Sequence, residues 1–363
     1  MLNALSPATN ALLPLLLLLH LLSSPLPAAS FTSPALLPPR SPRSPALLPL
    51  RAVSVLARRA KEAEVAALLA SLPVTDPLPA LLGTLPSLLS ARPPPAFPSR
   101  LRDSLTKRRG NLSIVAEYRL KGTGLAELGG SAAPAIVSKL IRVGGAAAAA
   151  VMADPRMGGC DYPDVAAFVA ENETARGGVP GPLPVVSSDL VVTEAQVARA
   201  KLAGAAAVTL SAAALGKELL KTLLEAAAAF GLEAVVFCGS EEEVVGAVGL
   251  GATIVCIAAE EDVEVKKEWR ERSIPEGVCA VCLISSAPDA LLTEVEEAWR
   301  LRDAGFNAAW VCDCLYKAGA DPAEQAGAII GAMKAKSSVK WFSAKGKSGR
   351  GEGAKEYLGD IMM

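Results

Sequence analysis

The sequence has almost no histidine and few aromatic residues. Its one histidine, His20, lies in an apolar N-terminal run. If that run is a leader that is removed, the mature chain has no imidazole, which excludes histidine-based acid–base catalysis, Ser-His-Asp triads and histidine-ligated metals. Aromatic residues make up 4% of the chain and hydrophobic residues 51%, most of them Ala, Leu and Val. This composition favours helices packed on a core of strands over a disordered chain.

An excess of positive charge is also lacking, since the formal net charge is −1. Six of the 36 basic residues lie in residues 1–61, which contain no acidic residue, so the remainder carries 30 basic and 37 acidic residues. Nucleic-acid-binding domains normally carry a clustered basic surface. The charge balance therefore predicts no nucleic-acid partner.

No apolar run is long enough to predict a transmembrane segment. The run ALLPLLLLLHLL at 11–22 is too short and contains proline. The SSPLPAAS that follows resembles a secretory cleavage site, but no positive charge precedes the run. The continuation to about residue 50 is rich in Ser, Pro and Arg and free of acids, which is typical of an organelle transit peptide. We predict that residues 1–50 direct the protein to the chloroplast stroma, with the secretory route as the alternative.

The seven cysteines do not suggest a disulfide framework, because their number is odd and most lie in apolar, strand-like runs. Cys279 and Cys282 have CxxC spacing, and Cys312 and Cys314 have CxC spacing. A structural zinc site needs such pairs in loops, so we interpret these cysteines as small buried hydrophobic residues, with a redox pair or metal site as the alternative. We predict no metal and no cofactor.

Two flanking regions differ from the body of the chain. Residues 51–98 are predicted to form a helix, because apolar residues recur at helical spacing over 53–71, followed by a proline-rich linker over 72–98. Residues 336–363 are basic and glycine-rich and contain an adjacent Trp-Phe pair. We predict an irregular tail there, which is either a solvated end or a docking peptide for a chloroplast protein partner.

From residue 111, short apolar runs alternate with helix-length amphipathic segments. The eight candidate strands are 113–118, 147–153, 184–188, 206–211, 233–239, 253–258, 279–286 and 307–313. Several helical segments end in Ala-Gly or Leu-Gly just before the next strand, as expected for a glycine C-cap. Eight strands and seven clear helices predict an α/β fold, a (β/α)₈ TIM barrel over 99–335. A doubly wound sheet is the alternative, but no Gly-x-Gly-x-x-Gly follows an early strand.

Charged residues gather at the end of the first candidate strand, where a barrel places its functional groups. Glu117, Arg119 and Lys121 alternate, so an extended chain would place all three on one face. The turn Gly122-Thr123-Gly124 follows, and its backbone amides and one hydroxyl can bind an anion. This stretch predicts a polar site at the mouth of the barrel.

The order of five segments resembles the indole-3-glycerol phosphate synthase family over about residues 99–333. The segments are SRLRDSLTKRRGNLSIVAEYRLKGTG, AAAAAVMADPRMGGCDYPDVAAF, LPVVSSDLVVTEAQVARAKLAGAAAVTLSAAAL, GLEAVVFCGSEEEVVGAVGLGATIVCIA and AGFNAAWVCDCLYKAGADP. The resemblance implies a ribulose-phosphate-binding type of barrel. It also implies the ring closure, with loss of carbon dioxide and water, of a carboxyphenylamino-deoxyribulose phosphate in tryptophan biosynthesis.

The resemblance implies catalytic positions on five strands, most of which are altered here. The strand-one glutamate is present as Glu117, but the strand-one lysine is replaced by Arg119, which keeps the charge and cannot donate a proton at neutral pH. Ser188 stands where the family has its strand-three lysine, the general acid. Phe237 replaces the strand-five glutamate, and Ala258 replaces the strand-six asparagine. Lys121 is then the best remaining proton donor.

The phosphate-binding positions that the resemblance implies are also altered. They correspond to the turn Gly122-Thr123-Gly124, to Ser285 and Ser286 after strand seven, and to Asp313 after strand eight. A desolvated carboxylate at the last position would repel a phosphate dianion.

Two functions are consistent with this pattern. The first is a barrel that has lost synthase catalysis and serves as a chloroplast binding, assembly or regulatory protein, with a small phosphorylated or anionic ligand as one candidate. The second is an active synthase, a decarboxylating lyase, in which Glu117 and Lys121 carry relocated chemistry. We favour the first, because four of five polar groups are replaced, three of them by residues unable to do related chemistry. Binding of a mixed-charge small molecule without catalysis is a third possibility.

Overall fold

The computed structural model describes residues 47–91, 97–106, 111–284, 291–316 and 322–335. The predicted C-terminal tail, and all but the last four residues of the predicted transit peptide, lie outside these ranges. Within them, none of the helices has both the length and the apolar character that crossing a membrane requires.

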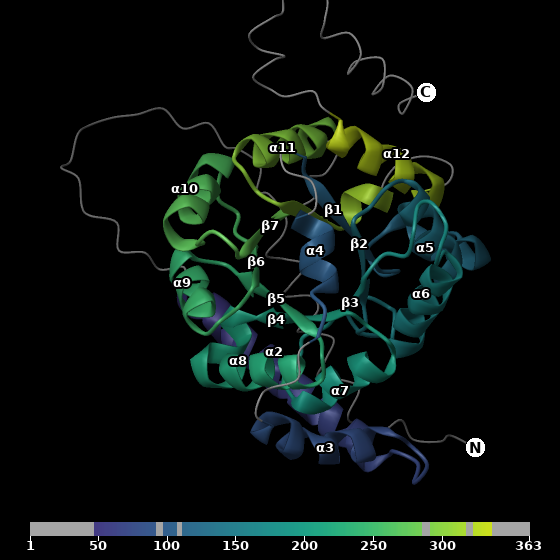
Figure 1. Cartoon of the computed structure of the whole chain (residues 1–363), viewed down its shortest axis with the longest axis vertical. Coiled ribbons are helices and arrows are strands. Elements are labelled where there is room, and N and C mark those ends of the chain that lie inside the picture. Colours follow the sequence, from purple (N-terminus) through teal and green to yellow (C-terminus); the bar gives the residue numbers. More distant parts are fainter. Residues whose placement is uncertain (1–46, 92–96, 107–110, 285–290, 317–321, 336–363) are drawn as a thin grey trace, which may run out of the picture. The chain divides into compact units, whose positions relative to one another are not determined.

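Eight parallel strands form a closed barrel (Figure 1). They are β1 Ser113–Tyr118, β2 Ala148–Met152, β3 Val185–Ser188, β4 Ala207–Ser211, β5 Glu233–Cys238, β6 Ile254–Ile257, β7 Cys279–Ile284 and β8 Ala308–Val311. Each strand pairs with the next, and β1 closes the barrel by pairing with β8, with Val115 opposite Trp310. The (β/α)₈ barrel predicted from the sequence is confirmed.

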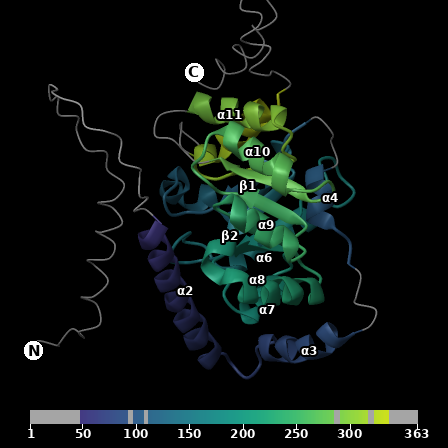
Figure 2. The ribbon, with the colours of Figure 1, turned by 90° about the vertical axis from the view of Figure 1, so that its left-hand side faces the viewer.

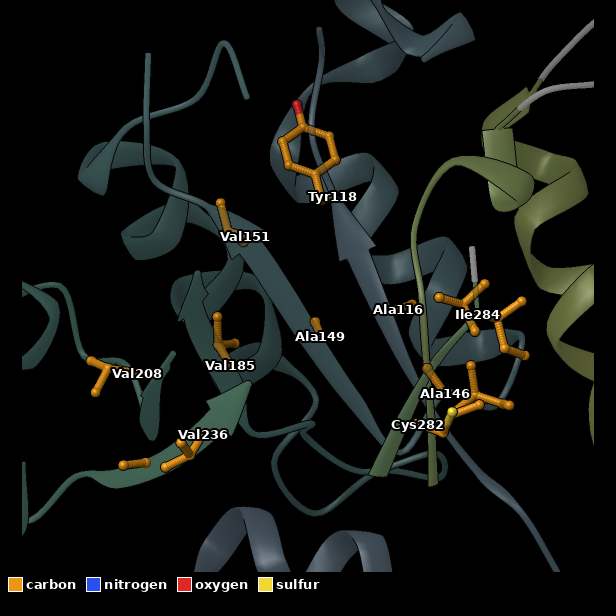
Figure 3. Close-up of a cluster of buried hydrophobic side chains, with 14 of the residues drawn as sticks. Ala116, Tyr118, Ala146, Ala149, Val151, Val185, Val208, Val236, Cys282 and Ile284 are labelled. Atoms are coloured by element: carbon orange, nitrogen blue, oxygen red, sulfur yellow. The ribbon is translucent and has the colours of Figure 1, made fainter. Parts of the chain in front are cut away.

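The strands are buried on both faces, which is why they read as nearly continuous apolar runs. On β1, Val115 contributes to the cluster inside the barrel, whereas Ile114 and Ala116 contribute to the cluster between strands and helices. Figure 3 shows part of this outer cluster, including Ala149 of β2 and Val185 of β3.

The helices that follow the strands surround the barrel (Figure 1). They are α5 Pro134–Val143, α6 Tyr162–Thr174, α7 Glu194–Leu202, α8 Ala212–Ala229, α9 Glu241–Gly249, α10 Val263–Ser273, α11 Leu291–Asp303 and α12 Pro322–Lys334. Gly204 after α7 and Gly305 after α11 both have φ of 82°, a left-handed conformation that favours glycine. The glycine C-caps predicted at these two helix ends are confirmed.

In the part of the chain that the structure describes, three helices precede the first strand: α2 Leu47–Ala70, α3 Leu78–Ser90 and α4 Arg100–Thr106. Helix α2 begins six residues before the predicted 53–71 segment. Helix α3 lies inside 72–98, so the prediction of a linker was wrong for this part. Pro77 precedes the helix, where proline is tolerated, and the leucine-rich segment that follows buries Leu78 completely.

Helices α2 and α4 lie at opposite ends of the barrel (Figure 2). Helix α4 closes the N-terminal end, because Leu101 and Leu105 pack among the interior side chains. The carboxylate of Glu233, at the start of β5, accepts hydrogen bonds from the Leu101 and Arg102 amides at 2.5 and 3.1 Å. The C-terminal end of the barrel, beneath α2, holds a cavity.

All seven cysteines are free, and six of them are buried. Cys279 packs inside the barrel, whereas Cys282 packs in the outer cluster, because residues an odd number apart lie on opposite faces of a strand. Burial raises the pKa of both thiols to about 12. The CxxC spacing therefore does not bring two sulfurs to one site, and the interpretation of this pair as small buried hydrophobic residues is confirmed.

The packing of α5 against α12 generates a prediction for Gly144→Ala. A Cβ at Gly144 would collide with the backbone of Gly327 in α12, so neither helix can relieve the contact by a side-chain rotation. We expect the variant to lose about 1–3 kcal/mol in the free energy of unfolding, measured by urea denaturation.

Gly246→Ala in α9 is the matched control. A Cβ there meets nothing within 4 Å, so alanine should stabilise the helix by about 0.5–1 kcal/mol. If the two variants were equally stable, the close approach of α5 and α12 would be contradicted.

Candidate functional site

A cavity of about 690 Å³ lies at the C-terminal ends of the strands, beneath α2. Parallel strands bring their C-terminal ends to one edge, so Glu117 of β1, Ser188 of β3, Phe237 of β5 and Trp310 of β8 all line it. Helix α2 contributes Lys61 and neighbouring small residues. Most of the lining is apolar.

Lys61 is the central cation of this site, although it belongs to a helix outside the barrel. Its Nζ lies 2.9 Å from Asp154 Oδ2 and 2.9 Å from Asp189 Oδ1, carboxylates that follow β2 and β3. It also lies 3.4 Å from Glu64 Oε1, one turn along α2. The Lys61, Asp154 and Asp189 side chains are all less than one tenth exposed, so one cation is shared by two carboxylates away from solvent.

The pKa shifts follow from this burial and pairing. Burial alone would lower the pKa of Lys61, but Asp189 and Asp154 outweigh that effect and raise it well above its usual range. Burial would raise the pKa of Asp154, but hydrogen bonds from Lys61 and two backbone amides lower it. Burial dominates at Asp189 and raises its pKa, and Lys61 and Gln196 offset this only in part.

Glu117 lies deep in the site, with 3% of its surface exposed. Trp310 donates a hydrogen bond from its indole Nε1 to Glu117 Oε2 at 2.6 Å. Burial raises the pKa of Glu117, and the bond from Trp310 and the nearby Cys312 thiol oppose the rise. Its second oxygen, Oε1, accepts no hydrogen bond of ordinary geometry from the described residues.

Aromatic rings form one wall of the cavity. Phe237 and Trp310 pack edge to face, with ring centroids 5.0 Å apart and an interplanar angle of 83°. The resemblance assigns a glutamate to the position of Phe237. In the structure, the Phe237 ring makes an aromatic contact with the Trp310 indole, which also donates a hydrogen bond to Glu117.

Arg119 also lines the cavity, but it is engaged in an ion pair with Asp313. Burial alone would lower the pKa of Arg119, and Asp313 outweighs it and raises the pKa further. The Asp313 carboxylate, expected to repel a phosphate, is therefore neutralised by Arg119, at the position to which the resemblance assigns the strand-one lysine.

Lys121 does not share the face of Glu117 and Arg119, which corrects the expectation from their alternation. Strand β1 ends at Tyr118, so the two-residue period does not continue. The Lys121 ammonium instead donates to the carbonyls of Pro155 and Arg156 at 2.7 and 3.0 Å, on the exposed side of the loop after β2. Its predicted role as proton donor stays a prediction.

The predicted phosphate turn also lies apart from the cavity lining. The hydroxyl of Thr123 donates to the carbonyls of Arg119 and Leu120 at 2.8 and 3.1 Å, and Gly122 has φ of 75°. Neither residue, nor Gly124, lines the cavity. Ser285 and Ser286 lie outside the described residues.

Ser188 and Ala258 do line the cavity, at the ends of β3 and β6. The sequence thus located five positions that the structure brings together: Glu117, Arg119, Ser188, Phe237 and Ala258. Among the described residues, no group of three or more His, Cys, Asp or Glu side chains is arranged to hold a metal ion.

The sequence analysis did not identify Lys61 as a site residue. A signal was present, because Ala57, Lys61, Glu64 and Leu68 recur at helical spacing and so share one face of α2. A lysine among small apolar residues on a face that packs inward needs a buried partner. The partners come from loops distant in the sequence, and no local pattern points to them.

Comparisons with known proteins agree with this architecture. A family model described as indole-3-glycerol phosphate synthase matches residues 86–322. An indole-3-glycerol phosphate synthase of Opitutus terrae is 28% identical over 242 residues, which cover 66% of this chain and 86% of that protein. Synthases of Streptomyces griseus and a Nocardioides species are 29% and 32% identical, over 48% and 42% of this chain. The chain spans 63% and 55% of the lengths of these two relatives.

Among solved structures, one described as native KDPGal has a TM-score of 0.44 and 15% identity, covering 64% of this chain and 95% of that one. A Schiff-base-forming fructose-1,6-bisphosphate aldolase has a TM-score of 0.44 and 16% identity, over 64% and 98%. These likenesses add nothing to the fold that the eight paired strands establish.

The Lys61 cluster generates a prediction for Lys61→Met. Methionine keeps the apolar stem but leaves Asp154 and Asp189 buried without their shared cation. We expect a loss of about 3–5 kcal/mol in the free energy of unfolding at pH 7, measured by urea denaturation. Adding Asp189→Asn should recover part of the loss, because one uncompensated carboxylate is removed.

The stability that this cluster contributes depends on pH with a defined sign. Because the pKa of Lys61 is raised in the folded protein, its contribution to the free energy of unfolding is fully present below about pH 10.5, the ordinary pKa of lysine. Because the pKa of Asp154 is lowered, its contribution is present above 3.8 and is lost as the pH falls below that value. The difference in the free energy of unfolding between wild type and Lys61→Met should therefore become smaller as the pH falls below about 3.8.

Lys217→Met is the matched control, since Lys217 is exposed on α8. It should change the free energy of unfolding by less than about 0.5 kcal/mol. Equal stabilities of the Lys61 and Lys217 variants would show that the buried pairs contribute nothing to folding.

Proposed function

Because the chain belongs to the indole-3-glycerol phosphate synthase family, we propose that it keeps the family's barrel but has lost synthase catalysis, and that it serves as a binding, assembly or regulatory protein. The synthase reaction needs a proton donor and a carboxylate placed around an anionic substrate. The positions that the resemblance assigns to these roles hold Ser188, Phe237 and Arg119.

One observation carries the proposal: the charged groups that line the cavity are already engaged with partners from this chain. Lys61 is held by Asp154 and Asp189, and Arg119 is held by Asp313. A lysine with two buried carboxylate partners holds its proton too firmly to act as a general acid near neutral pH. An arginine does not give up its proton at all in this range.

The alternative is an active synthase, a decarboxylating lyase of tryptophan biosynthesis. It is favoured by the family membership and by Glu117, which keeps the family's residue type and lines the cavity. In that case Lys121 would have to turn from the carbonyls of Pro155 and Arg156 into the cavity to donate a proton.

Complementation separates the two functions. Residues 46–363, which form one compact unit, would be expressed in a tryptophan auxotroph that lacks the synthase. We expect no growth without tryptophan, while the Opitutus terrae relative, used as positive control, restores it. Growth would overturn the proposal, and Glu117→Gln and Lys121→Ala should then abolish that growth if the alternative is correct.

We also propose that the protein acts in the chloroplast stroma and meets a protein partner through residues 336–363. The support is compositional: residues 1–50 have the character of a transit peptide, and the tail combines basic, aromatic and apolar residues.

The location and the partner are both tested in plant cells by fusing the full chain to a fluorescent protein and a biotin ligase. We expect fluorescence in plastids, and a set of biotinylated proteins that disappears when residues 336–363 are deleted while the location is unchanged. Fluorescence along the secretory route would contradict the location, and an unchanged set of labelled proteins would contradict the role of the tail.

A further inference from the structure

We infer that Asn172 is an acceptor for an N-linked glycan in the unfolded chain, and that attaching the glycan prevents the chain from folding. The fold is then open only to a compartment that does not make this modification. The inference rests on the proposed location in the chloroplast for its biological meaning. It gives a physical reason why the secretory route, the alternative to that location, is closed to this chain.

Two triplets of the sequence match the pattern Asn-x-Ser/Thr, which accepts N-linked glycans: Asn-Leu-Ser at 111–113 and Asn-Glu-Thr at 172–174. In secreted proteins such a triplet normally lies at the surface, because the glycan is bulky and solvated. Asn111 lies two residues before β1 and is half-buried. Asn172 instead lies in the last turn of α6 and is only 2% exposed.

The Asn172 side chain uses both of its amide protons and its oxygen inside the protein. Its Nδ2 donates to Ser138 Oγ and to the carbonyl of Phe168, both at 2.9 Å. Its Oδ1 accepts from the Leu183 amide at 2.8 Å. Because an asparagine side chain has only two N–H donors, Nδ2 cannot exchange a proton for another group without breaking one of these bonds.

These bonds belong to a buried network that joins α5, α6 and the segment before β3. Ser138 of α5 is completely buried and donates to Glu171 Oε2 at 2.7 Å. Glu171 Oε1 accepts from Arg142 at 2.5 Å, and Arg142 also donates to the Pro180 carbonyl at 3.0 Å. Removing one member of a buried network leaves its partners without their bonds. Asn172 lies where the two helices and this segment meet.

Glycan transfer changes this amide covalently. A bond forms between Nδ2 and C1 of the first N-acetylglucosamine, the bond from C1 to the diphosphate of the lipid-linked donor breaks, and Nδ2 releases one proton to solvent. Asn172 then has one N–H where the fold uses two, and a sugar must take the place of the Ser138 hydroxyl or the Phe168 carbonyl. Helices α5 and α6, which lie side by side (Figure 1), would have to separate, because a close-packed interior has no room for a sugar.

Burial does not protect Asn172 in a compartment that glycosylates chains during synthesis. The bond from Leu183 needs a residue that is made after Asn172. Barrel closure needs β8, which is made later still. The chain therefore presents Asn172 to the transferase before the fold exists, and the modified chain can no longer form the network.

Routing the full chain into the secretory pathway of plant cells tests the inference. A cleavable secretory signal precedes the chain, and every version carries Asn111→Gln so that one acceptor remains. We expect a mass shift that peptide N-glycosidase removes, in protein that is retained in the cells and sensitive to added protease. Thr174→Ala destroys the triplet without altering Asn172 and should raise the yield of protease-resistant protein by about tenfold or more.

Thr222→Ala is the matched control. Thr174 and Thr222 are both exposed helix residues whose hydroxyls donate to a carbonyl of the preceding turn, at 2.6 and 3.1 Å, but Thr222 belongs to no acceptor triplet. Thr222→Ala, and Thr174→Ser, which keeps the acceptor, should both stay glycosylated and unfolded. Folded protein that carries the glycan on Asn172 would overturn the inference, and so would a chain that is never modified there.

A second measurement separates the glycan from the oxidation of the seven free cysteines in the secretory pathway, and it decides if Thr174→Ala folds no better there. The full chain is coexpressed in the bacterial cytosol, where thiols stay reduced, with a soluble transferase that attaches glucose to the same triplet. We expect glucose on Asn172 in aggregated protein and none on Asn172 in soluble protein. Glucose on Asn172 of soluble protein, or of neither fraction, would overturn the inference. Fluorescence along the secretory route in the fusion experiment would contradict the proposed location instead, so the two failures are distinguishable.

Discussion

The site depends on one buried interaction, the pairing of Lys61 with Asp154 and Asp189. An isolated aspartate at either position would be costly to bury, and so would an isolated lysine. Bringing the three together gives each of them a partner of opposite charge, and it fixes α2 across the C-terminal ends of the strands. Helix α2, which covers the cavity, is held in place by this interaction. The same interaction engages a cation that lines the same cavity as Ser188, the position to which the resemblance assigns a lysine.

A second constraint comes from the aromatic wall. Trp310 is completely buried, holds Glu117 through its indole N–H, and packs edge to face with Phe237. The Phe237 ring adds apolar surface to the cavity beside the indole that holds Glu117. Burial is the largest influence on the pKa of Glu117 and raises it.

Much of the barrel could be predicted because its signals are local. The apolar run at 113–118 gave the bounds of β1 that the structure shows, and glycines such as Gly204 marked where helices end. Helix α3 was missed, because prolines in 72–98 resemble a linker even where one of them precedes a helical turn. Lys121 was placed on the wrong face, because alternation holds only while the strand lasts, and β1 ends at Tyr118.

The sequence by itself determined the barrel and its family, because strand period and segment order are properties of the linear chain. Only the tertiary structure decided how the charges pair. Lys61 and Asp154 are 93 residues apart, and Arg119 and Asp313 are 194 apart. No pattern of nearby residues encodes such pairs. They form because barrel closure brings the ends of all eight strands together under one helix, where each buried charge requires a partner.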